Sequence, residues 1–189
     1  MRSLLYVPGD RSKMLDGALE RGADVVVADL EDAVAPRSKG AARRAVATWL
    51  AGLATSGELP VEVWVRVNPG DLLADDVGAV TRPGLSGVCL AKAESADELV
   101  HLDQLLSGAE LAAGMVSGSV GVLPLLESAQ AVLAMGEIAA APRVARLGVG
   151  EVDLSSELGV QLGPDEHELL WVRSQLVMYS AAAGLDAPV

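Results

Sequence analysis

Short, near-continuous apolar runs recur along this chain, and they place the strongest limit on how it can fold. The runs do not alternate with polar residues, so both faces of each strand are expected to be buried. Strands of this kind are typical of a parallel sheet covered by helices. The predicted strands are 3–7, 24–28, 61–67, 87–91, 119–126 and 143–150.

Helical patterns fill the intervals between the predicted strands. Gly22 and Pro36 mark a helix end and a helix start, and Ser95 is a suitable N-cap. Repeated strand–helix units predict an α/β fold, with a single domain over 1–189. The predicted helices are 11–22, 37–53, 95–108, a segment that ends near 140, and 165–184; the predicted loops include 52–60, 68–71 and 82–87.

Composition and charge narrow the classes of partner. The chain has 189 residues and a formal net charge of −12, with a pI of about 4.5. This acidity argues against nucleic acid or an anionic membrane surface as the partner. No apolar run approaches the ~20 residues of a membrane span, and the opening apolar stretch is too short for a signal peptide. We therefore expect a soluble, cytoplasmic protein.

The residue types most often used in metal and nucleophile sites are scarce. Cys89 is the single cysteine, so an internal disulfide and a cysteine metal cluster are not expected. Because Cys89 lies inside a predicted strand, we expect a buried, inert thiol. His101 and His167 lie in helical patterns and are expected to be ordinary helix residues.

An acidic cluster directly follows the second predicted strand. In the stretch VVVADLEDAV, Asp29, Glu31 and Asp32 come immediately after a buried run. Carboxylates this close repel one another, so a cation or a set of fixed donors must stabilise them. Charged residues also follow the other predicted strands, and in parallel α/β proteins ligands gather at that end of the strands. The sequence therefore predicts a polar site there, with the cluster at its rim.

Glu127 and Asp153 follow the fifth and sixth predicted strands and form a candidate metal site. Two carboxylates, with water and substrate oxygens in the other positions, are typical of Mg²⁺. Structural interpretations stay open, because Glu127 can interact with a helix N-terminus and Asp153 can cap a helix over LSSEL. Arg66, at the end of the third strand, can either pair with the acidic cluster or clamp a substrate carboxylate.

Six segments follow one another in an order seen in one enzyme family. They are RSLLYVPGDR, DLEDAVAPRSK, WVRVNPG, CLAKAESADEL, LPLLESAQAVL and GVGEVDLSSELG. In these segments the chain resembles the citrate lyase β-subunit-like branch of the HpcH/HpaI aldolase superfamily. The resemblance implies a (β/α)8 TIM barrel that cleaves or forms a carbon–carbon bond. The implied substrates are 3-hydroxy-acyl-CoA thioesters such as citryl-CoA or malyl-CoA, which yield an acyl-CoA and a 2-oxo acid.

The resemblance also implies roles for individual residues. The metal ligands, which hold Mg²⁺, fall on Glu127 and Asp153. The implied catalytic residues are Arg66, Asp29, Glu31 and Asp32. The implied substrate-binding residues are Arg66, Arg11, Lys39 and Lys92, with Arg11 near the thioester or the CoA phosphates. In such a site, the metal polarises the keto-acid oxygens and fixed charges stabilise the enolate.

The chain departs from the family pattern mainly at its C-terminal side. Six strands are apparent and 185–189 resembles the start of a seventh, so the barrel is expected to be incomplete. A truncated fragment and a short natural homologue both fit. Val152 stands where many relatives have an acidic residue, and Glu151 is expected to compensate in part.

Alternatives from other classes also stay open. One is a class II aldolase that acts on free 2-oxo acids, and another is a non-catalytic, incomplete-barrel subunit. Because unpaired outer strands recruit partners or lower stability, we expect a homo-oligomer (a trimer or hexamer) or an association with other lyase subunits.

Overall fold

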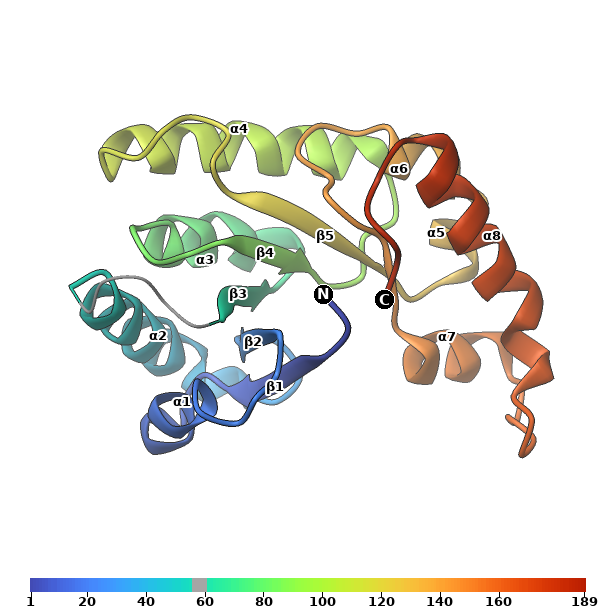
Figure 1. Cartoon of the computed structure of the whole chain (residues 1–189), viewed down its shortest axis with the longest axis horizontal. Coiled ribbons are helices and arrows are strands. Elements are labelled where there is room, and N and C mark those ends of the chain that lie inside the picture. Colours follow the sequence, from blue (N-terminus) through green and yellow to red (C-terminus); the bar gives the residue numbers. More distant parts are fainter. Residues whose placement is uncertain (56–60) are drawn as a thin grey trace. The chain divides into compact units, whose positions relative to one another are not determined.

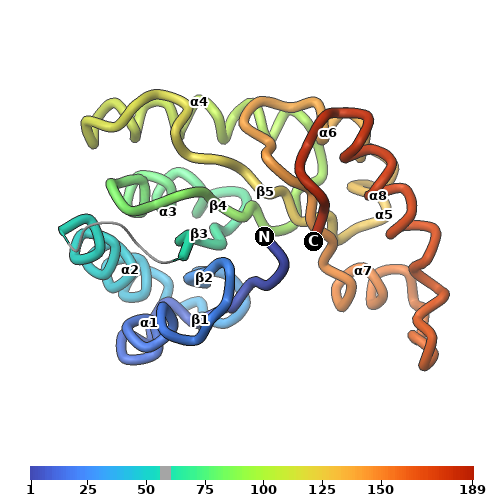
Figure 2. The backbone as a smooth tube through the Cα atoms, in the orientation of Figure 1, coloured from blue at the N-terminus to red at the C-terminus, as the bar shows by residue number. Residues whose placement is uncertain are grey.

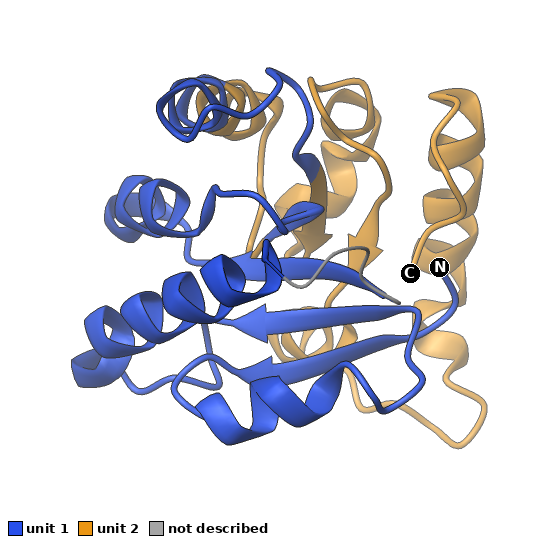
Figure 3. Cartoon of the chain, turned by 60° about the vertical axis from the view of Figure 1, so that its left-hand side comes forward, with its two compact units in different colours: residues 1–89, 104–121 blue, residues 90–103, 122–189 orange. Residues whose placement is uncertain are grey.

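The computed structural model describes residues 1–55 and 61–189. The chain divides into two compact units, which Figure 3 shows in different colours. Unit 1 comprises Met1–Cys89 and Gln104–Gly121, and unit 2 comprises Leu90–Asp103 and Val122–Val189. Both units are built from strands and helices that alternate along the chain (Figure 1).

The strands of unit 1 run parallel and in chain order. β1 (Leu4–Pro8) pairs with β2 (Val25–Asp29), and β2 pairs with β3 (Glu62–Val67). β4 (Gly87–Leu90) follows next to β3. Every residue of β2 is buried, including Asp29 at its end, and its apolar run of Val25–Ala28 is typical of a strand covered on both faces.

Three helices lie along one side of these strands, as the smooth trace in Figure 2 also shows. α1 (Ser12–Ala18) packs on β1, α3 (Leu73–Val80) packs on β3, and α2 (Lys39–Leu53) contacts both helices. Two 3₁₀ turns, η1 (Pro36–Ser38) and η2 (Gly70–Leu72), lead into α2 and α3.

Gly9 permits a close approach of two chain segments at the ends of β1 and β2. Its backbone N–H donates to the Asp29 carbonyl at 2.8 Å. A Cβ atom at Gly9 would lie 2.8 Å from the same oxygen and 2.9 Å from a methyl group of Val46. Glycine at this position therefore lets the chain turn tightly where the acidic cluster begins.

Unit 2 contains the remaining two strands. β5 (Gly121–Leu126) and β6 (Gly148–Val149) pair in parallel, with Leu125 opposite Gly148 and Leu126 opposite Val149. α4 precedes β5 and passes from unit 2 into unit 1 along its length. The helices are α4 (Ala96–Ala112), α5 (Ala129–Leu133), α6 (Met135–Ala139), α7 (Glu151–Leu158) and α8 (Leu170–Ala182), with the 3₁₀ turn η3 (His167–Leu169) before α8.

The segment 186–189 lies alongside β6 like the start of another parallel strand. The backbone N–H of Asp186 donates to Ala145, that of Val189 donates to Leu147, and that of Val149 donates to Val189, at 3.0–3.2 Å. The Arg146 guanidinium adds a 2.9 Å contact to the Asp186 carboxylate. These bonds have the pattern expected of the predicted seventh strand, although the segment is not assigned as a strand.

Some predicted boundaries were wrong. The strand predicted over 143–150 is regular only at Gly148–Val149. Arg143, the first residue of the predicted range, has a left-handed φ of 62°, and Val144 makes only an isolated bridge. The helix predicted to end near 140 is broken at Ala134 into α5 and α6. The loop predicted over 52–60 is helical up to Leu53, and its residues 56–60 lie outside the described residues.

The expected α/β fold is confirmed, with six parallel strands that alternate with helices as in part of a (β/α)8 barrel. The single domain over 1–189 stays a prediction. In the described ranges, no helix combines the length and apolar character that crossing a membrane requires.

Candidate functional site

Asp29 and Arg66 face each other because of strand register. They are opposite residues at the ends of β2 and β3. In neighbouring parallel strands, opposite residues point to the same side of the sheet. The two side chains meet in a bidentate ion pair, with Arg66 Nε 2.8 Å from one Asp29 oxygen and Nη2 2.5 Å from the other. This geometry is the most specific one available to an arginine–carboxylate pair.

The acidic cluster is stabilised by this guanidinium and by backbone donors. Asp29 also accepts the backbone N–H of Glu31 at 2.7 Å and that of Ala33 at 3.2 Å. Glu31 lies 3.2 Å from Arg66 Nη1 and accepts the Asp32 N–H at 2.8 Å. Asp29 and Glu31 are buried, whereas Asp32 is exposed. The fixed donors that the sequence required are therefore present.

Arg66 is charged at any pH at which the protein folds. Burial by itself would lower the pKa of this guanidinium, but the hydrogen bonds and charge of Asp29, followed by the charge of Glu31, raise it above its usual value. The guanidinium carbon also lies 5.3 Å from the centroid of the Tyr6 ring, which is a cation–π distance.

Lys39 holds the loop that carries the acidic cluster. Its ammonium group donates to the carbonyls of Leu30 at 2.8 Å and Glu31 at 2.7 Å, and to the Asn68 side-chain oxygen at 2.6 Å. An ammonium group has three hydrogens, and these three acceptors account for them. The contacts of Lys39 favour a positioning role, and its expected contact with a substrate anion stays a prediction.

A buried network centred on Asp76 was missed by the sequence reasoning. The Asp76 carboxylate accepts the backbone and side-chain N–H groups of Asn68 at 2.9 and 2.7 Å, and the Nε of Arg43 at 2.8 Å. Asn68 in turn donates to the Leu30 carbonyl at 2.9 Å. Asp76 therefore supports the same loop as Lys39, but it does so indirectly, through Asn68.

A sequence signal for Asp76 did exist. Leu73, Asp76, Val77 and Val80 are the buried residues of α3, and they follow the spacing of one helical face. An aspartate on an otherwise apolar face is rarely buried without partners, so the pattern points to a buried network. The signal was missed because 73–80 was not recognised as a helix between two predicted loops.

Cys89 and the two histidines are as expected. The Cys89 thiol is fully buried in β4, and burial raises its pKa to about 12. It is therefore protonated and unreactive at neutral pH. His101 lies in α4 and His167 begins η3, and both are exposed.

In unit 2, the Glu127 side chain lies against Gly150. Glu127 directly follows β5 and is 5% exposed. A Cβ atom at Gly150 would lie 2.4 Å from Glu127 Cγ and 2.8 Å from one of its carboxylate oxygens. The backbone N–H of Gly150 donates to the Leu126 carbonyl at 3.0 Å. Any larger residue at 150 would therefore displace the Glu127 carboxylate.

Asp153 lies in the first turn of α7, two residues after the helix begins. The N-cap of α7 is Gly150, so Asp153 is not the N-cap of a helix over LSSEL. Likewise Ser128 caps α5, accepting the Ala131 N–H at 3.1 Å. Among the described residues, the Asp153 carboxylate, which is only partly exposed, has no hydrogen-bond or ion-pair partner.

Glu151 is held by a different partner. Arg173 of α8 donates Nε to one Glu151 oxygen at 2.5 Å and Nη2 to the other at 2.7 Å. The same Nη2 donates to Glu166 at 2.6 Å. Glu151 was expected to replace in part the acidic residue that many relatives have at the position of Val152. The contacts do not favour this role, because both carboxylate oxygens of Glu151 accept hydrogen bonds from Arg173. Val152 itself is 83% exposed.

Two expected substrate-binding residues, Arg11 and Lys92, are exposed. Arg11 is exposed and lies 3.5 Å from the neighbouring Asp10 carboxylate. Lys92, exposed after β4, adopts a left-handed φ of 50°, which is uncommon for a lysine and typical of residues placed for function. Their contacts with CoA or other anions stay predictions.

The donor set of unit 2 fits Mg²⁺. Within the described residues, no group of three or more His, Cys, Asp or Glu side chains is arranged to hold a metal. Mg²⁺ keeps several waters and needs only one or two protein carboxylates. Glu127, packed on Gly150, and Asp153, without a protein partner in the described ranges, are carboxylates of that kind.

Comparison with known proteins places the chain in a family. A profile of the family described as HpcH/HpaI aldolase/citrate lyase matches residues 2–188, and the chain belongs to this family. Within it, the chain falls in the citrate lyase β-subunit-like branch. It is 34% identical to citrate lyase subunit beta of Haemophilus influenzae over 191 residues, which is 98% of this chain and 64% of that protein.

Another relative and a solved structure agree with this placement. The chain is 36% identical to (3S)-malyl-CoA thioesterase of Cereibacter sphaeroides over 167 residues, which is 87% of this chain and 53% of that protein. Protein CitE from Mycobacterium tuberculosis, solved with magnesium and pyruvate, superposes with a TM-score of 0.74 at 30% identity. That match covers 97% of this chain and 70% of the CitE chain.

Proposed function

We propose that this chain carries the larger part of a Mg²⁺-dependent carbon–carbon lyase. The substrate is a 3-hydroxy-acyl-CoA thioester such as citryl-CoA or malyl-CoA, and the products are an acyl-CoA and a 2-oxo acid. The chain spans 64% of the citrate lyase subunit beta of Haemophilus influenzae, so the activity of a whole protein of that length is part of the proposal. The observation that carries it is the buried Glu127 carboxylate directly after β5, with its side chain seated on Gly150.

Glu127 and Asp153 would hold the cation. When bound, Mg²⁺ supplies positive charge at the oxygens of the 2-oxo acid. Gly150 leaves room for the Glu127 side chain, and Asp153 lies in the first turn of α7. CitE from Mycobacterium tuberculosis with magnesium and oxaloacetate, at 30% identity, supports this metal and this class of acid.

Arg66 would bind a substrate carboxylate. The fork to Asp29 uses Nε and one N–H of Nη2, and a guanidinium has five N–H groups. Nη1 also faces Glu31 at 3.2 Å, which leaves one N–H on each of Nη1 and Nη2 for a second carboxylate. Asp29 and Glu31 keep the guanidinium charged and fixed in orientation, which is what a preorganised carboxylate clamp requires.

A second candidate is hydrolysis of the thioester. The identity of 36% to (3S)-malyl-CoA thioesterase favours it, because that relative acts on a CoA thioester of the same class. In both candidates the substrate carries CoA, whereas a class II aldolase on free 2-oxo acids does not need it. The release of a 2-oxo acid separates lyase from thioesterase.

The decisive test combines metal binding with product analysis. Mg²⁺ is titrated calorimetrically into the wild-type protein and into Glu127→Ala, and citryl-CoA and malyl-CoA are incubated with and without Mg²⁺. We expect weaker Mg²⁺ binding in the variant, and a 2-oxo acid that forms only with the metal. Equal Mg²⁺ affinity in the two proteins would remove the metal assignment, and release of free CoA without 2-oxo acid would favour the thioesterase.

A further inference from the structure

Tyr6 and Arg66 point to the same side of the sheet in unit 1. Tyr6 of β1 lies opposite Val27 of β2, and Val27 lies opposite Trp64 of β3. Arg66 follows Trp64 by two residues, and residues two apart in a strand share one face of the sheet. The strand register therefore brings an aromatic side chain from β1 towards the guanidinium group on β3.

The Tyr6 side chain makes two contacts with other strands. The guanidinium carbon of Arg66 lies over the ring, 5.3 Å from its centroid. The side chain also makes a hydrogen bond with the buried thiol of Cys89 in β4. Because the Arg66 side chain is only 15% exposed, the cation–π contact is partly shielded from water, and such contacts are stronger when they are desolvated. Tyr6 therefore links β1 to both β3 and β4.

The charges around Arg66 limit which kind of group can add a further contact to the guanidinium. Asp29 and Glu31 lie 2.5 and 3.2 Å from its nitrogens, so two negative charges already face one positive charge. A third carboxylate would repel an incoming substrate carboxylate. An aromatic ring attracts the cation through its quadrupole and carries no net charge. Tyr6 therefore contacts Arg66 without adding to this repulsion.

We infer that Tyr6 is a positioning residue for the substrate clamp: its ring holds the Arg66 guanidinium so that the N–H groups left open by Asp29 and Glu31 stay directed at a substrate carboxylate. This inference rests on the proposed function, in which Arg66 binds that carboxylate. Tyr6 acts through Arg66 in this role. A clamp that is oriented before binding pays less for ordering when the substrate arrives, so loss of the ring should weaken the affinity for the acid.

The test measures binding of oxaloacetate, a 2-oxo acid with two carboxylates, to the Mg²⁺-loaded protein by calorimetry. Tyr6→Leu removes the ring, and we expect the Kd for oxaloacetate to rise about fivefold or more. Tyr6→Phe keeps the ring but loses the hydroxyl group, so its Kd should stay within about twofold of the wild-type value. If Tyr6→Leu does not fold, Tyr6→Met takes its place with the same expectation.

A double substitution tests whether Tyr6 acts through Arg66. Arg66→Lys loses the fork, so it should weaken oxaloacetate binding by itself. Lysine has no planar set of N–H groups for the ring to direct. Adding Tyr6→Leu to Arg66→Lys should therefore raise the Kd by less than about twofold more, whereas independent effects would multiply.

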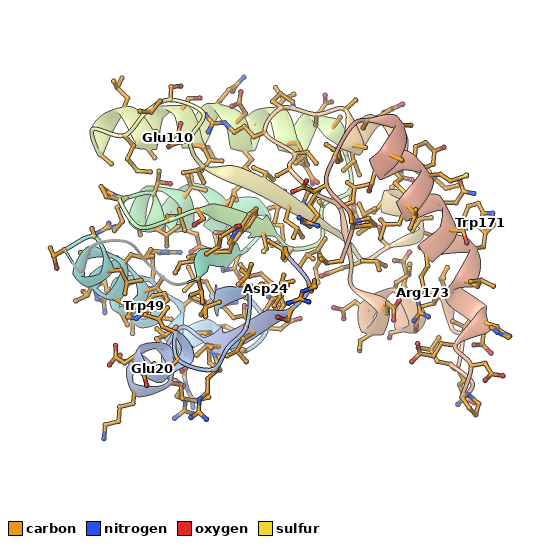
Figure 4. All side chains as sticks on the ribbon, viewed as in Figure 1. Glu20, Asp24, Trp49, Glu110, Trp171 and Arg173 are labelled. Atoms are coloured by element: carbon orange, nitrogen blue, oxygen red, sulfur yellow. The ribbon has the colours of Figure 1, made fainter. Side chains whose placement is uncertain are left out.

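Tyr179 provides a matched control. It is the other tyrosine of the chain and is 39% exposed, against 40% for Tyr6. It lies in α8 of unit 2, the helix on which Figure 4 labels Trp171 and Arg173. Tyr179→Leu makes the same change at a similar exposure, so the Kd for oxaloacetate should stay within about twofold of the wild-type value. An equal loss of affinity in Tyr179→Leu and Tyr6→Leu would overturn the inference.

The outcomes separate this inference from the proposed function. If Arg66→Lys weakens binding but Tyr6→Leu does not, or if Tyr6→Phe weakens it as much as Tyr6→Leu, the inference is wrong and the clamp stands. If Arg66→Lys binds oxaloacetate as the wild type does, the clamp of the proposed function is itself wrong, and so is the role of Tyr6. A loss of affinity that Tyr6→Phe avoids and that disappears in the Arg66→Lys background supports the inference.

Discussion

Asp29 ends a strand in unit 1 and Asp153 follows a strand in unit 2, but the protein engages the two carboxylates differently. Asp29 accepts four hydrogen bonds, two from Arg66 and two from backbone N–H groups. Asp153 has no hydrogen-bond or ion-pair partner within the described part of the chain. A carboxylate with saturated oxygens holds structure, whereas one without protein partners is suited to an external cation.

The same contrast extends to the residues around each aspartate. In unit 1, Lys39 donates directly to the loop of the acidic cluster, and Asp76 holds Asn68, which donates to the same loop. In unit 2, the nearest additional acid, Glu151, is paired with Arg173. Substitutions in unit 1 should therefore act mainly on stability, and those at the unit 2 ligands mainly on metal binding.

The largest effect is expected for Asp29→Ala. The change leaves the partly buried Arg66 charge without its bidentate partner, which should lower the free energy of unfolding by about 3–5 kcal/mol. Urea unfolding followed by circular dichroism measures the loss. A stability close to that of wild type would break the comparison, because Asp29 would then not be structural.

Asp76→Ala tests the network beneath the loop, with Asp75→Ala as its control. Asp76 is 1% exposed and accepts from Asn68 and Arg43, so its loss should cost about 2–4 kcal/mol. Asp75 has a side chain that is 69% exposed and touches the same Arg43 at 3.1 Å, so its loss should cost less than about 0.5 kcal/mol. Similar losses of unfolding free energy in the two variants would show that burial of Asp76 does not matter.

Arg66→Lys tests whether Arg66 contributes to substrate turnover in addition to its ion pair with Asp29. Lysine keeps the charge but cannot form the fork. We therefore expect kcat/KM on the preferred CoA thioester to fall about thirtyfold, which corresponds to a loss of roughly 2 kcal/mol of transition-state stabilisation. The measurement is steady-state kinetics at saturating Mg²⁺. Unchanged kinetics would assign Arg66 to structure alone and sharpen the difference between the units.

Asp153→Asn should have the smallest effect on stability. Asp153 has no hydrogen bond or ion pair with the described residues. The substitution therefore removes none, and the free energy of unfolding should change by less than about 0.5 kcal/mol. Mg²⁺ affinity should nevertheless fall by more than about tenfold. Thermal unfolding without metal and calorimetry with metal give the two values, and a large loss of stability would contradict the assignment.

The fold was predictable where a short local pattern decides it. The apolar runs of β1 to β5 were located to within about two residues, because burial on both faces leaves an unbroken apolar sequence. β6 was not, since only Gly148–Val149 of the predicted run 143–150 form a regular strand and Val144 makes only an isolated bridge. α3 was missed because its buried face includes Asp76, which weakens the helical pattern.

The sequence predicted which residues belong to the candidate site, but it did not predict which residues they contact. The strand ends indicated Asp29, Arg66, Glu127 and Asp153, because the end of each strand is visible in the sequence. The partners of Lys39 and Glu151 depend on contacts between residues 8–29 positions apart in the sequence. Such contacts follow from tertiary packing, and no local pattern encodes them.

The contacts of Lys39 also have a consequence for covalent chemistry. The chain has three lysines, at positions 13, 39 and 92, and acylating reagents attack only an unprotonated amine. At Lys39 that lone pair forms only if the ammonium group gives up a hydrogen that Leu30, Glu31 or Asn68 accepts. Amine labelling should therefore mark the exposed Lys13 before Lys39, and late labelling of Lys39 would report the moment at which the loop of the acidic cluster opens.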